Sequence, residues 1–415
     1  MRATKVLSNI LGMKQVRATA CAFDDRRLII EVRPTNRLAR CCGCLCRVRR
    51  IYDHHRGREW RHVDFGGMKV ALRYDLRRVD CPRCGVRAEL VPWADAASAF
   101  TRAFEQQVAY LAQHTDKTTV VALMRVAWAT VGRIVERVVK RLSPADRLDG
   151  LRHIGVDELS YRRHHKYITI ITDHDTGRVV WAREGKSEAT LNAFFADLGP
   201  TRCAQLLAVT LDLSQAYIQS VSAHAPNAMQ VFDRFHVQRL AHDALDQVRR
   251  QLMSAQQARG QRRAIKSTRF VLQKNPKNLT DAERQRLAQV QATNRPLYRA
   301  YLLKETLASI LDRRQYHVAR EQLRQWLGWA ARSQLKPFIR VAKTIRKHMA
   351  GILAYVSTGL SNGRAEGLNG KARVITRRAY GFHAAASFIS LLFLCCSLPK
   401  LSPLRTFRTV HPLAC

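Results

Sequence analysis

The sequence predicts an α/β protein of several parts, whose core is a mixed five-stranded sheet with covering helices. Two observations predict this class. The chain has 415 residues, which is too many for one ordinary hydrophobic core, so two or three domains are expected. Between residues 150 and 240, strand-like and helix-like apolar patterns alternate. Strand patterns with clustered cysteines precede this segment, and polar helical patterns follow it.

The changes of pattern divide the chain into six segments. A strand-rich zinc-binding module comes first, and a small helical domain of helix-turn-helix type follows. The first part of the α/β core, a helical insertion and the last helices of the core come next. The last segment has no periodicity and is expected to be a disordered tail. In chain order the expected boundaries are 1–95, 100–145, 150–240, 241–350, 351–398 and 399–415.

The chain carries a large excess of positive charge. Its 71 lysines and arginines exceed its 32 aspartates and glutamates, which gives a net charge of +39. A polyanionic partner is the simplest reason for so much like charge. No stretch is long and apolar enough for a membrane helix, and the N-terminus lacks the apolar core of a secretory signal. We therefore expect a cytoplasmic, nucleoid-associated protein whose thiols stay reduced.

In the first segment, cysteines form two C-x-x-C pairs. Cys41 and Cys44 make one pair, and Cys81 and Cys84 make the other, with a strand-like stretch between them. Two such pairs are typical of a closed tetrahedral zinc site with a structural role. We therefore predict that these four thiolates hold a zinc ion.

The choice of zinc ligands stays open at this point, because other donors lie nearby. These are Cys42, Cys46, His54, His55 and His62. Cys46 could replace Cys44. Arginines surround the two pairs and would place the module against phosphates. They are Arg40, Arg47, Arg49, Arg50, Arg83 and Arg87.

The second segment has the apolar spacing of three short helices. In the third, over residues 128–142, one inward face is expected. It consists of Val131, Ile134, Val135 and Val138. A short turn over residues 125–127 fits a helix-turn-helix, whose later helix enters the major groove of DNA. The expected DNA contacts are Arg125, Arg133, Arg137 and Lys140. A plain structural linker is the alternative.

The α/β core begins with three strand patterns that look antiparallel. The first ends on Asp157, and "KYITIITD" and "RVVWARE" are the next two. A helix with a possible cap at Ser187 follows, then an apolar strand that ends at Asp212. After a second helix, a fifth strand ends near Asp233. If the sheet is RNase H-like, the first and fourth strands are neighbours.

Adjacent strands would then bring Asp157 and Asp212 together. Two carboxylates side by side repel each other and favour a hard cation such as Mg²⁺, which completes its shell with substrate phosphate. A third acid from a helix would complete a two-metal site, and Glu366 is the candidate. It lies in the helical stretch that begins at Ser361, where helical pitch places Asn362 or Asn369 on a nearby face.

Each acid alone could simply balance neighbouring arginines. The expected placement of all three together favours the metal site. The arginines around Glu366 would then contact phosphates of a nucleic acid bound at this site; otherwise they form a solvated basic helix face. They are Arg364, Arg373, Arg377 and Arg378.

Four motifs occur in order after the cysteines and the three helices: "GVDE", "LDLSQAY", "VFDRFHV" and "SNGRAEGLN…RRAYGF". With them, residues 35–395 resemble a bacterial insertion-sequence transposase of the DDE type, in the ISL3 family. The resemblance implies that Asp157, Asp212 and Glu366 are the catalytic triad. It places Asp233 and His236 in a family motif whose role is unassigned, with a structural role preferred.

The resemblance also implies cofactors and partners. Two Mg²⁺ or Mn²⁺ ions would serve strand cleavage and strand transfer, and a structural zinc would hold the N-terminal module. The partners would be the terminal inverted repeats and the target DNA, bound by a homo-oligomer. Two other functions remain open: a catalytically silent DNA-binding repressor derived from a transposase, and an RNase H-like nuclease specific for DNA structures.

Overall fold

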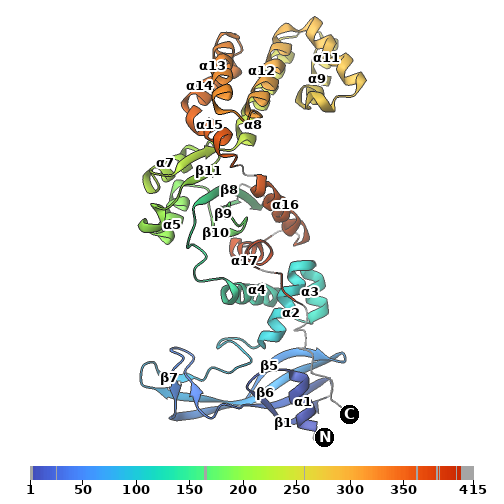
Figure 1. The fold of residues 1–415 in the computed structure, drawn as a ribbon. Coiled ribbons are helices and arrows are strands. Elements are labelled where there is room, and N and C mark those ends of the chain that lie inside the picture. The colour runs from blue at the N-terminus through green and yellow to red at the C-terminus, as the bar shows by residue number, and fades with distance from the viewer. Residues whose placement is uncertain are drawn as a thin grey trace, which may run out of the picture. The chain divides into compact units, whose positions relative to one another are not determined.

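The computed structural model describes most of the chain (Figure 1). The described residues are 3–24, 26–162, 166–256, 258–360, 363–379, 382, 384–398 and 400–402; the side chains of residues 363–366 and 369 are outside the description. Two compact units divide the chain. We call Met1–Ser143, Arg377–Tyr380 and Ser390–Cys415 the N-terminal unit, and Pro144–Thr376 with Gly381–Ile389 the central unit. The expected tail lies outside the described residues from residue 403 onward.

The N-terminal unit contains a five-stranded sheet. Its elements are α1 (Ala3–Leu11), β1 (Val16–Asp24), β2 (Arg27–Pro34), β5 (Ile51–Phe65), β6 (Met68–Cys81) and β7 (Gly85–Ala88). The strand order is β1-β2-β6-β5, with β7 also paired to β6. Val32, Trp60 and Leu72 lie in its buried core, and the Trp60 ring meets Trp93 edge-on at 5.5 Å between centroids. A separate two-stranded hairpin consists of β3 (Ala39–Arg40) and β4 (Arg47–Val48).

Three helices follow in the same unit. They are α2 (Arg102–His114), α3 (Lys117–Met124) and α4 (Trp128–Leu142). The side chains of Thr101 and Asp116 accept backbone hydrogen bonds at the N-termini of α2 and α3, so both helices begin at capping residues. The buried face of α4 includes the four predicted residues Val131, Ile134, Val135 and Val138. Leu394, late in the chain, is buried in the same cluster.

A mixed five-stranded sheet forms the centre of the other unit, as predicted. Its strands are β8 (His153–Arg162), β9 (Lys166–Asp173), β10 (Val179–Glu184), β11 (Ala208–Leu211) and β12 (Met229–Phe232). The order is β10-β9-β8-β11-β12. β8, β9 and β10 are antiparallel, whereas β11 runs parallel to both β8 and β12.

One expectation about this sheet is wrong. Asp157 does not end its strand but lies in the middle of β8, which continues to Arg162. The continuation keeps the alternation of a half-buried strand, since Leu159 and Tyr161 are buried and Ser160 is exposed.

Helices cover this sheet. The connecting helices are α5 (Glu188–Leu198), the short α6 (Pro200–Cys203) and α7 (Gln215–His224). A capping box between Ser187 and Thr190 starts α5, as the serine predicted. Phe194 of α5 packs edge-on against Trp181 of β10 at 5.7 Å, which joins the helix to the sheet.

Residues after β12 are helical. They form α8 (Arg234–Ala255), α9 (Arg259–Ser267), α10 (Arg269–Gln273), a 3₁₀ turn (Pro276–Asn278), α11 (Asp281–Thr293), α12 (Arg295–Leu311), α13 (Tyr316–Arg332), α14 (Lys336–Lys347) and α15 (Met349–Thr358). Trp326 and Phe338 are fully buried within this part. Two further helices are α16 (Gly363–Arg378) and α17 (Ala385–Cys396).

In the described part of the chain, no single helix has the length and apolarity needed to cross a bilayer. Helices α3 and α4 have this length and apolarity only when they are counted together, and a bend of 98° separates them.

Candidate functional site

Three aspartates lie at one level of the central sheet. Thr210 of β11 pairs with Gly155 of β8, so Asp212 and Asp157 come two residues further along each of two parallel strands. Leu211 pairs with Phe232 of β12, so Asp212 and Asp233 follow as the next pair, and the amide of Asp233 donates to the Leu211 carbonyl at 3.2 Å. Since neighbouring strands lie about 4.8 Å apart, the acids form one transverse row.

The row lies on the face of the sheet that packs against α15, rather than on the face toward α5 and α7. Ala208 of β11 and Val231 of β12 pack with Ala354 of α15. Side chains alternate along a strand, so Asp212 and Asp233 lie on the face of Ala208 and Val231. Register places Asp157 on that face as well.

Backbone amides hold two of the carboxylates. Oδ1 of Asp212 accepts from the Ser214 amide at 2.9 Å, in the turn that leads into α7. Oδ1 of Asp157 accepts from the Glu158 amide at 2.7 Å. Both carboxylates are half-buried, so they are positioned and still reachable.

The charges of the row act on the neighbouring Glu158. Burial raises the pKa of its carboxyl group, and the charges of Asp212 and Asp157 raise it further. A hydrogen bond with Tyr217 and the charge of Lys186 oppose this. The net result is a raised pKa of Glu158, to which burial contributes most and the two aspartates add.

Asp233 is the most buried acid of the row, at 6% exposed. It precedes α8, and its carboxylate lies 4.0 Å from Nε2 of His236 one helical turn later. Sequence reasoning did not place Asp233 beside Asp212. The signal was present, because each of the two aspartates directly follows a short apolar strand.

Glu366 and Arg364 belong to α16, but their side chains lie outside the described residues. The predicted partner of the two aspartates therefore stays a prediction. Asn362 also lies outside the description, as does the side chain of Asn369. Arg373 and Arg377 of the same helix are exposed, and Arg378 donates to the Gln113 carbonyl at 3.3 Å.

All donors in the row are carboxylate oxygens. Carboxylate oxygens on adjacent strands fit a hard divalent cation such as Mg²⁺ or Mn²⁺. The donor atoms of the row are therefore of the type that binds Mg²⁺ or Mn²⁺, the cations that the resemblance implies.

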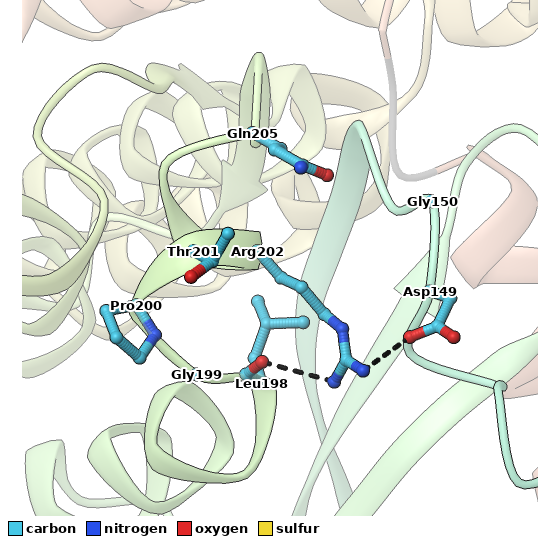
Figure 2. Close-up of a pocket in the computed structure, with 8 residues that line it drawn as sticks. All are labelled: Asp149, Gly150, Leu198, Gly199, Pro200, Thr201, Arg202 and Gln205. Carbon is cyan, nitrogen blue, oxygen red and sulfur yellow. Dashed lines mark hydrogen bonds and ion pairs between the residues drawn. The ribbon is translucent and has the colours of Figure 1, made fainter.

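The central unit also has a cavity of about 560 Å³, which lies elsewhere (Figure 2). Asp149 and Gly150 line it just before β8, and Gln205 lines it before β11. These are the amino ends of the two parallel strands, whereas the acids lie further toward their carboxyl ends. Arg202 occupies the cavity wall and pairs with Asp149 at 2.7 Å. The cavity is separate from the acidic row.

In the N-terminal unit, the four predicted thiols come together. The Sγ atoms of Cys41, Cys44, Cys81 and Cys84 all lie within 4.8 Å of one another. Those of Cys44 and Cys81 are 3.5 Å apart. Within the described residues, the four thiols form the group that could hold a metal; Cys42, Cys46 and the three histidines named above are not part of it.

The pKa values of two of these thiols are shifted in opposite directions. Burial works to raise the pKa of Cys41, but hydrogen bonds from the amides of Cys44 and Gly43 help to bring it to about 7. In contrast, hydrogen bonding with Cys44 raises the pKa of Cys84 to about 12, with burial and the charge of Cys41 contributing. Thiolates brought this close repel one another, and a bound Zn²⁺ would relieve the repulsion.

His62 is instead part of the junction between β5 and α2. Its Nδ1 lies 2.9 Å from Oγ1 of Thr101, the residue that caps α2. Burial, with the charge of Arg61, lowers the pKa of His62 to about 4. A buried neutral imidazole in this position has a structural explanation that its sequence position did not indicate.

The helix-turn-helix candidates divide into two groups. Arg133 and Lys140 are exposed on α4. Arg137 donates to the buried carboxylate of Glu105 at 2.8 Å, and Arg125 pairs with Asp64. Arg133 and Lys140 are thus the more available for a phosphate.

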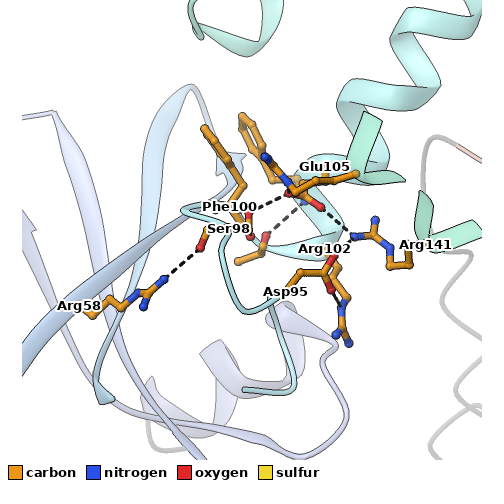
Figure 3. A network of polar contacts seen from close by, with 10 residues as sticks. Arg58, Asp95, Ser98, Phe100, Arg102, Glu105 and Arg141 are labelled. Atoms are coloured by element: carbon orange, nitrogen blue, oxygen red, sulfur yellow. Dashed lines mark hydrogen bonds and ion pairs between the residues drawn. The ribbon is translucent and has the colours of Figure 1, made fainter. Parts of the chain in front are cut away.

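Glu105 is the centre of a polar network at the start of α2 (Figure 3). It is fully buried and accepts from Ser98, Arg137 and Arg141, each at 2.8 Å. Arg141 also donates to Asp95 at 2.6 Å. The network joins α4 to α2 and to the segment before it, and so fixes the orientation of α4.

Three family models match successive parts of the chain. A family model described as "Transposase", of the ISL3 type, matches residues 154–392. One for the helix-turn-helix domain of transposase family ISL3 matches residues 89–139, and one for the zinc-finger of transposases IS204, IS1001, IS1096 and IS1165 matches residues 37–84.

Two curated relatives extend the comparison to nearly the whole chain. The transposase for insertion sequence element IS1557 of Mycobacterium tuberculosis is 39% identical over 418 residues, covering 94% of this chain and 93% of the relative. The transposase for insertion sequence element IS1001 of Bordetella parapertussis is 29% identical, covering 86% of this chain and 88% of the relative.

Proposed function

The chain belongs to the ISL3 family of insertion-sequence transposases, and from that premise we propose that it cuts and joins DNA at the ends of its element. Asp157, Asp212 and Glu366 form the active site. The observation that carries the proposal is the row of carboxylates across β8, β11 and β12.

The N-terminal unit recognises the terminal inverted repeats. Its α4 enters the major groove, with Arg133 and Lys140 exposed to reach DNA. Four cysteines hold a structural zinc that closes the module, whose exposed arginines meet the phosphate backbone. The protein acts at the nucleoid in the cytoplasm, and as a homo-oligomer, because two element ends must be paired.

The central unit supplies the chemistry. A pair of Mg²⁺ or Mn²⁺ ions bound there would act as Lewis acids on the attacking and leaving oxygens. Asp157 and Asp212 hold their carboxylates at a fixed separation because β8 and β11 are hydrogen-bonded neighbours. Glu366 completes the ligand set from α16, and Arg373 on the same helix contacts a phosphate near the cut.

The reaction has two exchanges at phosphorus. In the first, water forms a bond to the scissile phosphorus and the 3′-oxygen leaves with a proton, as a free 3′-hydroxyl. In the second, this 3′-hydroxyl attacks a target phosphodiester, so one P–O bond forms as one breaks. Each exchange conserves the number of P–O bonds, and no nucleotide cofactor is required.

Asp157→Ala tests the proposal most simply. The variant should bind a duplex with the element's end as tightly as the wild type does, and should lose Mg²⁺- or Mn²⁺-dependent cleavage. Asp175→Ala is the matched control, since Asp175 is an exposed carboxylate in the turn after β9 of the same sheet; it should cleave normally. Mg²⁺- or Mn²⁺-dependent cleavage by purified Asp157→Ala protein would contradict the assignment of the catalytic triad.

The wild type distinguishes the two other functions. A repressor would bind the ends without nicking them at any divalent cation concentration. A structure-specific nuclease would cut junctions regardless of repeat sequence and would not join ends.

A further inference from the structure

Helix α9 of the insertion has one strongly basic face. Its four cations are Arg259, Arg262, Arg263 and Lys266, and all are exposed. They occupy positions i, i+3, i+4 and i+7, which lie on one side of an α-helix. Ile265 is the one buried residue of the helix, so α9 is anchored by a single apolar side chain and presents the basic face to solvent.

Acids that could balance this face are missing from the surrounding sequence. From residue 247 to residue 280 there is no aspartate or glutamate, against nine lysines and arginines. Three of the nine form ion pairs: Arg249 and Arg250 pair with Asp246, and Lys274 pairs with Glu283. Within the described part of the chain, none of the four cations of α9 forms an ion pair, although Arg262 donates to the Gln256 carbonyl at 2.6 Å.

Such a face destabilises α9 in the free protein. Arg259 and Arg263, and Arg262 and Lys266, are like-charge pairs at i, i+4, and each destabilises a helix by about 0.2–0.5 kcal/mol. A nine-residue helix is also marginal by itself. A polyanion along this face would remove the repulsion and stabilise the helix.

We propose that the basic face of α9 binds the phosphate backbone of duplex DNA, without reading its sequence. The four cations lie between Arg259 and Lys266, seven helical rises apart, which is about 10 Å along the helix axis. Duplex DNA carries one negative charge per ~1.7 Å of its axis, so several phosphates lie within this length. This inference rests on the proposed function and adds a DNA contact outside the zinc module, the helix-turn-helix and the acidic row.

Arg263→Ala/Lys266→Ala in the full-length protein tests the inference. Alanine is the best helix former, so α9 should persist. Losing two phosphate contacts should lower the slope of log Kd against log salt by about 2, and weaken binding up to roughly 60-fold at 0.1 M salt. The loss should be equal for a duplex with the element's end and for one of unrelated sequence.

Arg320→Ala/Arg324→Ala is the matched control. Both arginines are exposed on α13 of the same insertion, where Glu321 lies between them in sequence. This variant loses the same charge and should keep a salt slope close to that of the wild type. An unchanged slope and Kd in the α9 variant would overturn the inference, as would an equal loss in both variants.

The two proposals fail in different ways. If the wild type cleaves element ends and the α9 variant binds DNA as the wild type does, only this inference fails. If the wild type neither prefers nor cleaves element ends but the α9 variant still loses salt-dependent binding, the proposed function fails and the DNA contact stands.

Discussion

At the scale of single residues, the proposed chemistry depends on carboxylates that the backbone holds at one level of three parallel strands. Asp157, Asp212 and Asp233 come into line because Gly155 pairs with Thr210 and Leu211 with Phe232. A shift of one residue in either pairing would turn an aspartate to the opposite face of the sheet. The side chains that set this register are therefore as important to the site as the acids.

Gly155, two residues before Asp157, is one such position. A Cβ atom there would lie 2.7 Å from Oγ1 of Thr172 and 3.0 Å from Nε2 of His174. Both side chains are buried, and His174 contacts Thr210 at 2.6 Å, so they cannot easily move. Gly155→Ala should lower the free energy of unfolding by about 1–3 kcal/mol, measured by urea denaturation.

Gly260→Ala is the control for this substitution. A Cβ atom at Gly260 meets nothing within 4 Å, and the residue lies in helix α9. The substitution should therefore raise stability by about 0.4–1 kcal/mol. Equal effects of the two alanines would show that the space around Gly155 does not limit the sheet.

At the scale of elements, much of the α/β core was predictable, because its strands and helices have strong apolar patterns. Three antiparallel strands, helix, strand, helix and strand follow in the predicted order. The end of β8 was not predicted, because the pattern was read only to Val156, and the buried residues that follow, Leu159 and Tyr161, alternate on the opposite face of the strand. The row with Asp233 requires strand register, which no single stretch of sequence contains.

The same limit applies to α4. Its inward face was predicted from helical spacing, since apolar residues must be buried. The ion-pair partners of the arginines on α4 were not predicted. Glu105 is distant in sequence and contacts Arg137 only after α2 and α4 pack together. Likewise, the C-x-x-C spacing identified the four thiols, whereas the rival histidines could be set aside only once the strands were placed.

The junction of β5 and α2 should be sensitive to pH through His62. The unfolded chain protonates this histidine below about pH 6.5, whereas the folded protein keeps it neutral down to about pH 4. The unfolded state therefore binds more protons than the folded state between these pH values. The contribution of His62 to stability is complete above pH 6.5 and falls as the pH decreases. The loss between pH 7.5 and 5 should be roughly 2 kcal/mol.

Hydrogen exchange of amides in β5 and α2, followed against pH, measures this loss. His62→Gln should remove most of the pH dependence. His114→Gln, at the exposed end of α2, should retain it. A wild type whose protection in these elements is the same at pH 7.5 and pH 5 would show that His62 is not held neutral by burial.

At the scale of the whole molecule, a net charge of +39 is divided among several surfaces. The zinc module, α4 and α9 each expose cations, and each is expected to meet DNA phosphates. Many arginines are not available for this purpose, since Arg77, Arg137, Arg141 and Arg249 hold carboxylates within the fold. Net charge alone therefore overstates the number of DNA contacts, and the salt slope of binding counts them better.

The central claim is that three acids distant in sequence share divalent cations at the DNA strand. Binding of Mn²⁺ to the full-length protein, titrated by electron paramagnetic resonance with and without an element-end duplex, tests it most directly. The account predicts that Asp157→Asn, Asp212→Asn and Glu366→Gln each weaken Mn²⁺ binding, while Asp175→Asn does not. Wild-type Mn²⁺ affinity in Glu366→Gln, with cleavage intact, would contradict it.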